Sequence, residues 1–217
     1  MKHLRQYIRQ ILLTEGAKSW DAFPEDVAIV INHYDYGDGL DEVYIYYAVI
    51  DSDTGKPHEI RPFEDRINDI NGERIYGKIG IHTVEDYGPC DGAMKVENSR
   101  ASSGWGPLLY DVAIEYATIK ANGLMPDRVS VSGEAKNVWN YYLGNRSDVI
   151  AHQLDDLKNT LTPFSLKDNC NQSVSRHEPG EVLSFDGDWK ESPLSKRYTK
   201  KPITINKLKS LGLLVEL

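Results

Sequence analysis

Val96-Glu-Asn-Ser-Arg-Ala-Ser-Ser-Gly-Trp-Gly-Pro-Leu-Leu-Tyr110 is the stretch that decides how this chain folds. It begins as an apolar strand end, continues as a loop of small residues with glycines at 104 and 106, and reaches Pro107, which is typical of the first turn of a helix. A Gly-rich turn between a strand and a helix presents free backbone N–H groups at the positive end of the helix dipole. We therefore predict an anion-binding cradle here, of the kind that holds a phosphate or pyrophosphate.

Helices are predicted after this loop. Pro107 to Lys120 has an apolar stripe at helical spacing, and Asn122-Gly123 is a helix stop. A short extended piece follows at 124–131. Ser132 is then a predicted N-cap for a second helix, whose buried side carries Ala135, Val138, Trp139 and Tyr142 and which ends at Gly144. A third helix is predicted at about 148–159.

Strands are predicted before the loop. Val27 to Tyr34 and Glu42 to Ile50 are rich in β-branched and aromatic residues and predict an antiparallel hairpin. Further strands are expected at 75–84 and 93–97. The predicted fold class is therefore α/β (α+β), with a mixed, mostly antiparallel central sheet flanked by helices over residues 20–162. Residues 163–217 have little periodicity and are predicted to form an irregular C-terminal extension packed on that domain.

The composition excludes several classes of protein. No apolar run approaches the ~20 residues that cross a bilayer, so no membrane span is predicted. The net charge of −8 argues against general nucleic-acid binding. Cys90 and Cys170 are far apart, and the spacing of Asp35, Asp38 and Asp41 is not that of an EF-hand loop. Neither a disulfide framework nor a metal site is therefore predicted.

Charge is unevenly distributed along the chain. From Asp21 to Gly55 there are nine acidic residues and no Lys or Arg, whereas from Lys190 to Lys209 seven Lys or Arg accompany one Glu. The ordinary interpretation is two solvated faces of opposite sign. An alternative is that the acidic region attracts a cationic amine substrate.

Residues 1–17 form a separate segment, predicted to be an amphipathic helix that ends in Leu13-Thr-Glu15-Gly. A short amphipathic helix followed by Leu-x-Glu resembles the capsid-targeting leaders of tailed-phage internal head proteins, which a prohead protease cuts after the Glu. This resemblance implies a cleavable leader and a protein packaged in a virion. The alternatives are an ordinary first helix packed on the domain and a mitochondrial-type presequence.

Two linked spacings run through the central part of the chain. Val96 is followed at fixed intervals by Gly104, Gly106 and the pair Leu108-Leu109, and the second helix has Ser132, Ala135, Val138 and Trp139 as a cap followed by Ala-x-x-apolar-aromatic. In these spacings the chain resembles the GCN5-related N-acetyltransferase superfamily. The resemblance covers residues 93–143 by motif and residues 25–92 by strand count. It implies the fold of that superfamily and acetyl-CoA as the cofactor.

The resemblance also implies roles for individual residues. The backbone of Val96 would pair with the pantetheine arm of the cofactor, and Asn137 would be a further cofactor contact. Glu97, at the strand end, is the nearest candidate to accept the proton of the amine, and its alternative is a solvated loop carboxylate. Tyr142, three residues after the position of the family's tyrosine, is the candidate to protonate the departing thiolate, and its alternative is a core or helix-face tyrosine. The pyrophosphate would be held by the loop and the first turn of the helix: Ser103, Gly104, Trp105, Gly106 and Leu108.

The chain departs from the family pattern at two positions. The Gln or Arg that usually precedes the first glycine falls on Ala101, beside Arg100, and the usual tyrosine falls on Trp139, which has no hydroxyl group. Three functions follow. One is a cytoplasmic acyltransferase that moves an acetyl group from CoA to an amine of a small molecule or protein. Another is a phage head-internal structural or effector protein in the host cytoplasm or virion, with a capsid or host protein as partner. The third is a degenerate module that binds CoA or a partner without catalysis.

Overall fold

The computed structural model describes residues 16–35, 41–63, 66–83, 92–127, 131–154 and 191–217. The predicted leader helix, up to residue 15, lies outside the described residues. The elements, in chain order, are η1 (Trp20–Ala22), β1 (Val27–Asp35), β2 (Asp41–Ile50), β3 (Pro57–Glu59), β4 (Gly77–Thr83), β5 (Met94–Ala101), α2 (Gly106–Lys120), β6 (Leu124–Met125), α3 (Gly133–Asn145), β7 (Val149–Gln153), η4 (Pro193–Ser195), β8 (Lys196–Lys200), α4 (Ile203–Ser210) and β9 (Leu214–Glu216).

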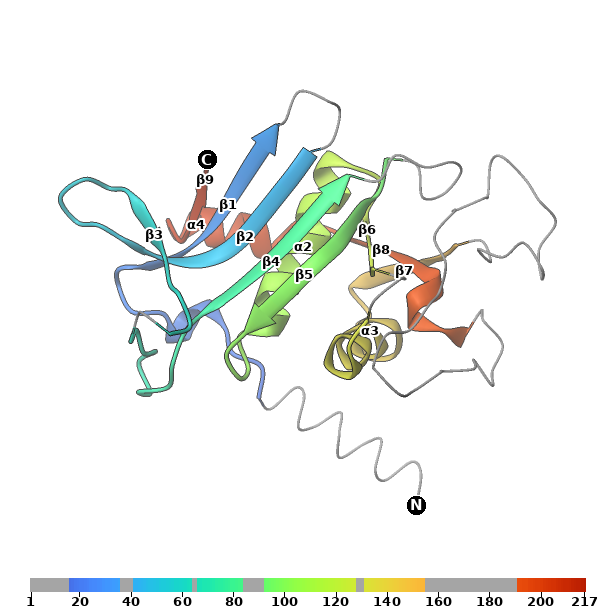
Figure 1. The fold of residues 1–217 in the computed structure, drawn as a ribbon, viewed down its shortest axis with the longest axis horizontal. Coiled ribbons are helices and arrows are strands. Elements are labelled where there is room, and N and C mark those ends of the chain that lie inside the picture. Colours follow the sequence, from blue (N-terminus) through green and yellow to red (C-terminus); the bar gives the residue numbers. More distant parts are fainter. Residues whose placement is uncertain (1–15, 36–40, 64–65, 84–91, 128–130, 155–190) are drawn as a thin grey trace, which may run out of the picture.

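All nine strands belong to one sheet (Figure 1), with the order β7-β8-β6-β5-β4-β2-β1-β9 and with β3 beside β2. The β1–β2, β2–β4, β4–β5, β6–β8 and β7–β8 pairs are antiparallel, whereas β5–β6 and β1–β9 are parallel. The predicted class, a mixed and mostly antiparallel sheet with helices against it, is confirmed at this level.

The helix α2 is the centre of the hydrophobic core. It contacts β2, β4 and β8 of the sheet and also α4, which lies on the same face (Figure 1). The sheet covers one side of α2, and α4 covers another side. Apolar residues are therefore buried almost all round the helix: Leu108, Leu109, Tyr110, Val112, Ala113, Ile114, Tyr116 and Ala117. The helix predicted from Pro107 is confirmed and begins one residue earlier.

Two further predictions about local structure are confirmed. The strands expected at 27–34 and 42–50 are β1 and β2, paired antiparallel from Val27–Val49 onward. Ser132 caps α3, because its Oγ accepts a hydrogen bond from the Ala135 N–H at 3.2 Å. Within the described residues, no helix has the length and apolar character needed to span a membrane.

The strands β5 and β6 separate soon after they meet. Only Met94 and Lys95 of β5 pair with β6, at Leu124 and Met125, although β5 continues to Ala101. The residue after β6 is proline, which lacks the N–H group that a continuing ladder would need. From Val96 on, β5 therefore has no described strand partner on its β6 side, and α3 occupies the space beyond it.

The helix predicted at 148–159 is wrong over its described part. Residues Val149–Gln153 form strand β7, paired antiparallel with β8 from Val149–Lys200 to Gln153–Lys196. Local periodicity favoured a helix, but β-branched residues at 149 and 150 suit a strand, and the pairing partner lies far along the chain. Tertiary pairing decided the structure here. Residues 155–159 lie outside the described residues.

The described end of the chain is not an irregular extension. Residues 191–217 supply β8 in the interior of the sheet, α4 on its helical face, and β9 at the edge beside β1. The strand β8 was missed because its inward residues include Lys196 and Lys200, which are buried although lysine normally indicates a solvent face. It also passes Gly123, where φ is +94° and a Cβ would lie 2.7 Å from the Tyr198 carbonyl oxygen.

Candidate functional site

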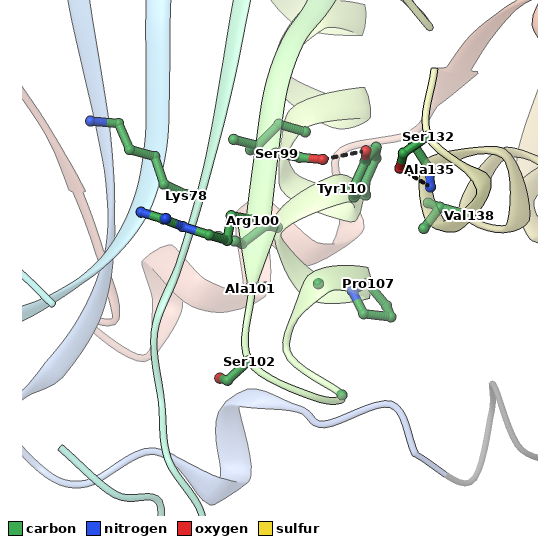
Figure 2. A pocket seen from close by; sticks show the side chains of 14 residues that line it. Lys78, Ser99, Arg100, Ala101, Ser102, Pro107, Tyr110, Ser132, Ala135 and Val138 are labelled. Carbon is green, nitrogen blue, oxygen red and sulfur yellow. Dashed lines mark hydrogen bonds between the residues drawn. The ribbon is translucent and has the colours of Figure 1, made fainter. Parts of the chain in front are cut away.

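A cavity of about 440 Å³ lies beside the last residues of β5, Ser99–Ala101, beyond the point where β5 and β6 separate. Its walls come from β4 and β5, the loop after β5, the first turns of α2 and the N-terminal half of α3 (Figure 2). The two motifs of the sequence thus meet at one cavity. The lining residues are Lys78, Ile79, Ser99, Arg100, Ala101, Ser102, Gly104, Gly106, Pro107, Leu109, Tyr110, Ser132, Ala135 and Val138.

The loop at one end of the cavity is fixed by backbone hydrogen bonds. The Trp105 N–H donates to the Ser102 carbonyl at 3.1 Å, and the Lys18 N–H donates to the Gly104 carbonyl at 2.9 Å. Gly104 has φ +79°, and a Cβ there would lie 2.1 Å from the Gly16 carbonyl oxygen, so the position requires glycine. The Trp105 N–H is engaged in the turn, which leaves fewer donors for an anion than the sequence alone suggested.

Trp105 anchors this loop to the core. Its fully buried ring packs on Phe23 and Tyr47, with ring centroids 5.2 and 5.4 Å away, and the Tyr47 hydroxyl donates to the Trp105 carbonyl at 2.7 Å. The side chain does not line the cavity. Trp105, predicted as a cofactor contact, therefore positions the loop and the start of α2.

The N-terminus of α2 faces the same end of the cavity. The N–H groups of Gly106 and Leu108 belong to the first turn and have no acceptor within the helix, while Pro107 has no N–H group. The first turn contains no acidic residue that would neutralise the helix dipole. This end of the cavity can therefore accept an anion.

The strand β5 carries a bulge beside the cavity. Gly80 of β4 pairs with Asn98, whereas the next residue, Ile81, pairs with Val96, so Glu97 is the additional residue. Val96 is buried and Glu97 is exposed. Bulges commonly redirect side chains near sites, and this one lies just before Ser99, the first residue of β5 that lines the cavity. Glu97 itself is not part of the wall.

Tyr142 lies outside the cavity wall. Its ring is buried, and its hydroxyl group is bonded to the Pro107 carbonyl and to Asp111 Oδ1, both at 3.1 Å. Burial, together with the nearby Asp111 carboxylate, holds the pKa of Tyr142 well above its ordinary value. Four other predicted cofactor contacts are absent from the lining as well. Ser103 and Asn137 are exposed, and the side chains of Val96 and Leu108 are buried.

Sequence reasoning missed the hydroxyl pair that does line the cavity. The Tyr110 hydroxyl on α2 lies 2.9 Å from Ser99 Oγ on β5 (Figure 2). Burial raises the pKa of Tyr110, and the bond to Ser99 partly opposes the shift. The rings of Tyr110 and Trp139 pack edge to face, with centroids 5.5 Å apart, so α3 holds the Tyr110 ring in place. Helical spacing predicted only a buried face here.

Comparisons with known proteins add no assignment. No family model matches the chain, and no characterised protein or solved structure gave a significant match. Within the parts of the chain that the structure describes, no group of three or more His, Cys, Asp or Glu side chains is arranged to hold a metal ion.

Proposed function

We propose that the cavity binds acyl-CoA and that the protein transfers the acyl group, an acetyl group in the simplest case, to an amine. The observation that carries this proposal is the position of the separation between β5 and β6. It opens a cavity that has the Gly-rich loop and the N-terminus of α2 at one end and an unpaired strand edge along one side.

The chemical groups of CoA suit these two features. The pyrophosphate would accept hydrogen bonds from the first-turn N–H groups of Gly106 and Leu108. The pantetheine arm carries two amides, which would pair with the free backbone edge of β5 between Ser99 and Ala101, as a peptide does when it adds to a sheet. The thioester would then lie toward the bulge at Glu97.

The reaction needs two proton transfers. The amine nitrogen forms a bond to the thioester carbon, the C–S bond breaks, the nitrogen loses a proton, and the thiolate gains one. We assign the thiolate proton to the Tyr110 hydroxyl, because Tyr110 lines the cavity and Tyr142 does not. Glu97 does not line the cavity either, but it is exposed at the bulge toward which the thioester would lie, so it is the candidate acceptor of the amine proton.

The strand order supports the resemblance to the GCN5-related N-acetyltransferases. The order on which the resemblance rests is strands, a Gly-rich loop, a helix, a strand and a second helix, and the chain has it as β1 to β5, the loop after β5, α2, β6 and α3. The chain differs at Trp139, where the family has a tyrosine. In this chain α4 and β9 continue the fold past β8.

The test is equilibrium binding of acetyl-CoA to the protein and to a matched pair of glycine variants. A Cβ at Gly106 would lie 3.8 Å from Ala101, so Gly106→Ala should fold normally while placing a methyl group against the phosphate. Gly144→Ala, at the far end of α3 with no atom within 4 Å of the new Cβ, is the control. We expect at least a tenfold loss of affinity for Gly106→Ala and none for Gly144→Ala.

The same titration distinguishes the alternatives. At 100 times its Kd, acetyl-CoA should add about 2.7 kcal/mol to the stability of the wild-type protein. No stabilisation at millimolar acetyl-CoA would refute cofactor binding. Binding without transfer to any amine in a broad panel would instead favour the non-catalytic module, for which the replacement at Trp139 is the supporting observation.

A further inference from the structure

Two cations lie side by side in the wall of the cavity. Lys78 of β4 and Arg100 of β5 are directly opposite each other in the antiparallel register, and both line the cavity. Their side chains project to the same side of β5, away from α2 and α3 (Figure 2). Like charges directly opposite each other in a sheet destabilise it, so this pair needs a reason.

The two side chains differ in their surroundings. Lys78 Nζ lies 3.1 Å from Glu59 Oε2 and 4.2 Å above the centroid of the Tyr44 ring, so it is held in place. Arg100 is exposed, and among the described residues no acidic side chain forms an ion pair with it. Lys78, Arg100 and Glu59 together carry a net charge of +1 at this wall, in a chain whose net charge is −8.

We propose that Lys78 and Arg100 bind an oxyanion of the ligand, a phosphate or carboxylate group, at a position separate from the cradle at the N-terminus of α2. A planar guanidinium group beside a fixed ammonium group suits such an oxyanion. The two positions are separate because the cations project to one side of β5, whereas α2 and its first turn lie on the other (Figure 2).

The identity of the ligand rests on the proposed function. If the ligand is acyl-CoA with an amine acceptor, the second oxyanion has two sources: the 3′-phosphate of the cofactor, or an acidic group on the acceptor. An acidic acceptor would contradict the expectation that the acidic segment 21–55 attracts a cationic amine. Such an acceptor would be anionic or zwitterionic near its amine.

The experiment compares the wild-type protein with Arg100→Gln, Glu59→Gln and the control Lys95→Gln, which removes a cation from the same strand but not from the cavity wall. Binding of acetyl-CoA and of its 3′-dephospho analogue is measured at two salt concentrations. Transfer kinetics are measured with paired amines that differ only by a carboxylate group.

We expect Arg100→Gln to lose roughly tenfold or more in affinity for the anion-bearing ligand, as when a charge-assisted hydrogen bond is removed. Glu59→Gln should bind that ligand more tightly, because a competing carboxylate is gone, and Lys95→Gln should bind as the wild type does. Since the pair is repulsive, Arg100→Gln should unfold at the wild-type temperature or above it, which separates lost binding from lost structure.

The outcomes identify the source or overturn the proposal. Weaker binding of acetyl-CoA with unchanged binding of the 3′-dephospho analogue assigns the site to the cofactor phosphate. An increased KM for the carboxylated amine alone assigns it to the acceptor. If Arg100→Gln and the wild type have the same affinity for each cofactor form and the same KM for each amine, the proposal is overturned.

Failure of the proposed function would be visible separately, as absence of acetyl-CoA binding to the wild type. In that case the pair is tested with inorganic phosphate, followed by NMR of the arginine side-chain resonances. A shift that disappears in Arg100→Gln supports the oxyanion site, and no such shift overturns it.

Discussion

Two regions of α2 differ in whether their polar groups have partners inside the protein. At the N-terminal end, the first-turn N–H groups of Gly106 and Leu108 have no acceptor within the helix and lie beside a cavity. Further along, the buried carboxylate of Glu115 accepts hydrogen bonds from the Lys200 ammonium group, from the Thr204 N–H at 2.9 Å and from the Ile205 N–H at 2.7 Å. The first turn has N–H groups without an acceptor in the helix, whereas the carboxylate of Glu115, five residues before the end of α2, is bonded to β8 and α4.

This difference shows how one helix can serve both binding and stability. Polar groups that are satisfied inside the protein hold elements together but have no capacity left for a ligand. Glu115 caps the N-terminus of α4 in this way and ties it to α2. The first-turn donors at the other end have no acceptor within the helix, so on the proposed function we expect substitutions there to change affinity and substitutions around Glu115 to change stability.

The largest expected effect is the loss of stability in Glu115→Ala. The substitution removes the nearest counter-charge of the Lys200 ammonium group, whose side chain is 2% exposed, and leaves only Asp111 and Asp148, each 3.7 Å away. It also removes the acceptor of two helix N–H groups. Breaking a buried ion pair by removing one partner costs about 3–5 kcal/mol. Urea unfolding monitored by circular dichroism measures the change in the free energy of unfolding.

The control is Lys120→Ala, at the exposed last residue of the same helix, which should change that free energy by less than about 0.5 kcal/mol. If Glu115→Ala were as stable as Lys120→Ala, the bonded half of α2 would not be the stabilising half, and the comparison of its two ends would fail.

The sequence predicted the local part of this arrangement well. Alternation of apolar and β-branched residues predicted β1 and β2, and Pro107, Ser132 and the Gly-rich stretch predicted where the helices begin. These signals depend on residues that are close in sequence. They could therefore be recognised without knowledge of the fold.

The parts that could not be predicted depend on distant partners. Lys200 looks like a solvent-exposed residue until Glu115, far along the chain, is known to face it. Tyr110 looks like one more apolar position of α2 until Ser99 is brought to its hydroxyl group. The motif spacing fell on Trp139, and Tyr142 was chosen as a nearby tyrosine, but its hydroxyl is held by Asp111.

The second prediction compares the two tyrosines of this region. On the proposed mechanism, Tyr110→Phe should lower kcat about a hundredfold, because general acid catalysis is lost, with little change in acetyl-CoA affinity. Tyr142→Phe should leave kcat within a few-fold of the wild type and reduce stability by about 1 kcal/mol, because its hydroxyl is bonded inside the protein. Steady-state kinetics and urea unfolding of both variants separate the two roles. Reversed results would move the proton donor to Tyr142.

The smallest expected effect concerns how the ion pairs beside α2 respond to pH. Arg146 donates two hydrogen bonds to Asp148, both at 2.7 Å, and these lower the pKa of Asp148 below its ordinary value near 3.8. A lowered carboxylate pKa contributes stability that is complete above the unfolded-state value and is lost as the pH falls through the folded-state value. The pair is partly exposed, so we expect less than about 1 kcal/mol between wild type and Asp148→Asn at neutral pH, shrinking below about pH 4.

Asp111 should show the opposite slope. Its pKa is raised, chiefly by burial and against the opposing charges of Lys200 and Arg146. Its folded-state pKa lies above the unfolded-state one, so the Asp111 contribution becomes more favourable as the pH falls through that raised value. Urea unfolding of Asp148→Asn and Asp111→Asn at a series of pH values should therefore give differences from the wild type that change in opposite directions with acidification. If both differences in unfolding free energy changed in the same direction with pH, burial would not be the dominant influence on the pKa of Asp111. The surroundings of Asp111 would then be more accessible to water than its contacts indicate.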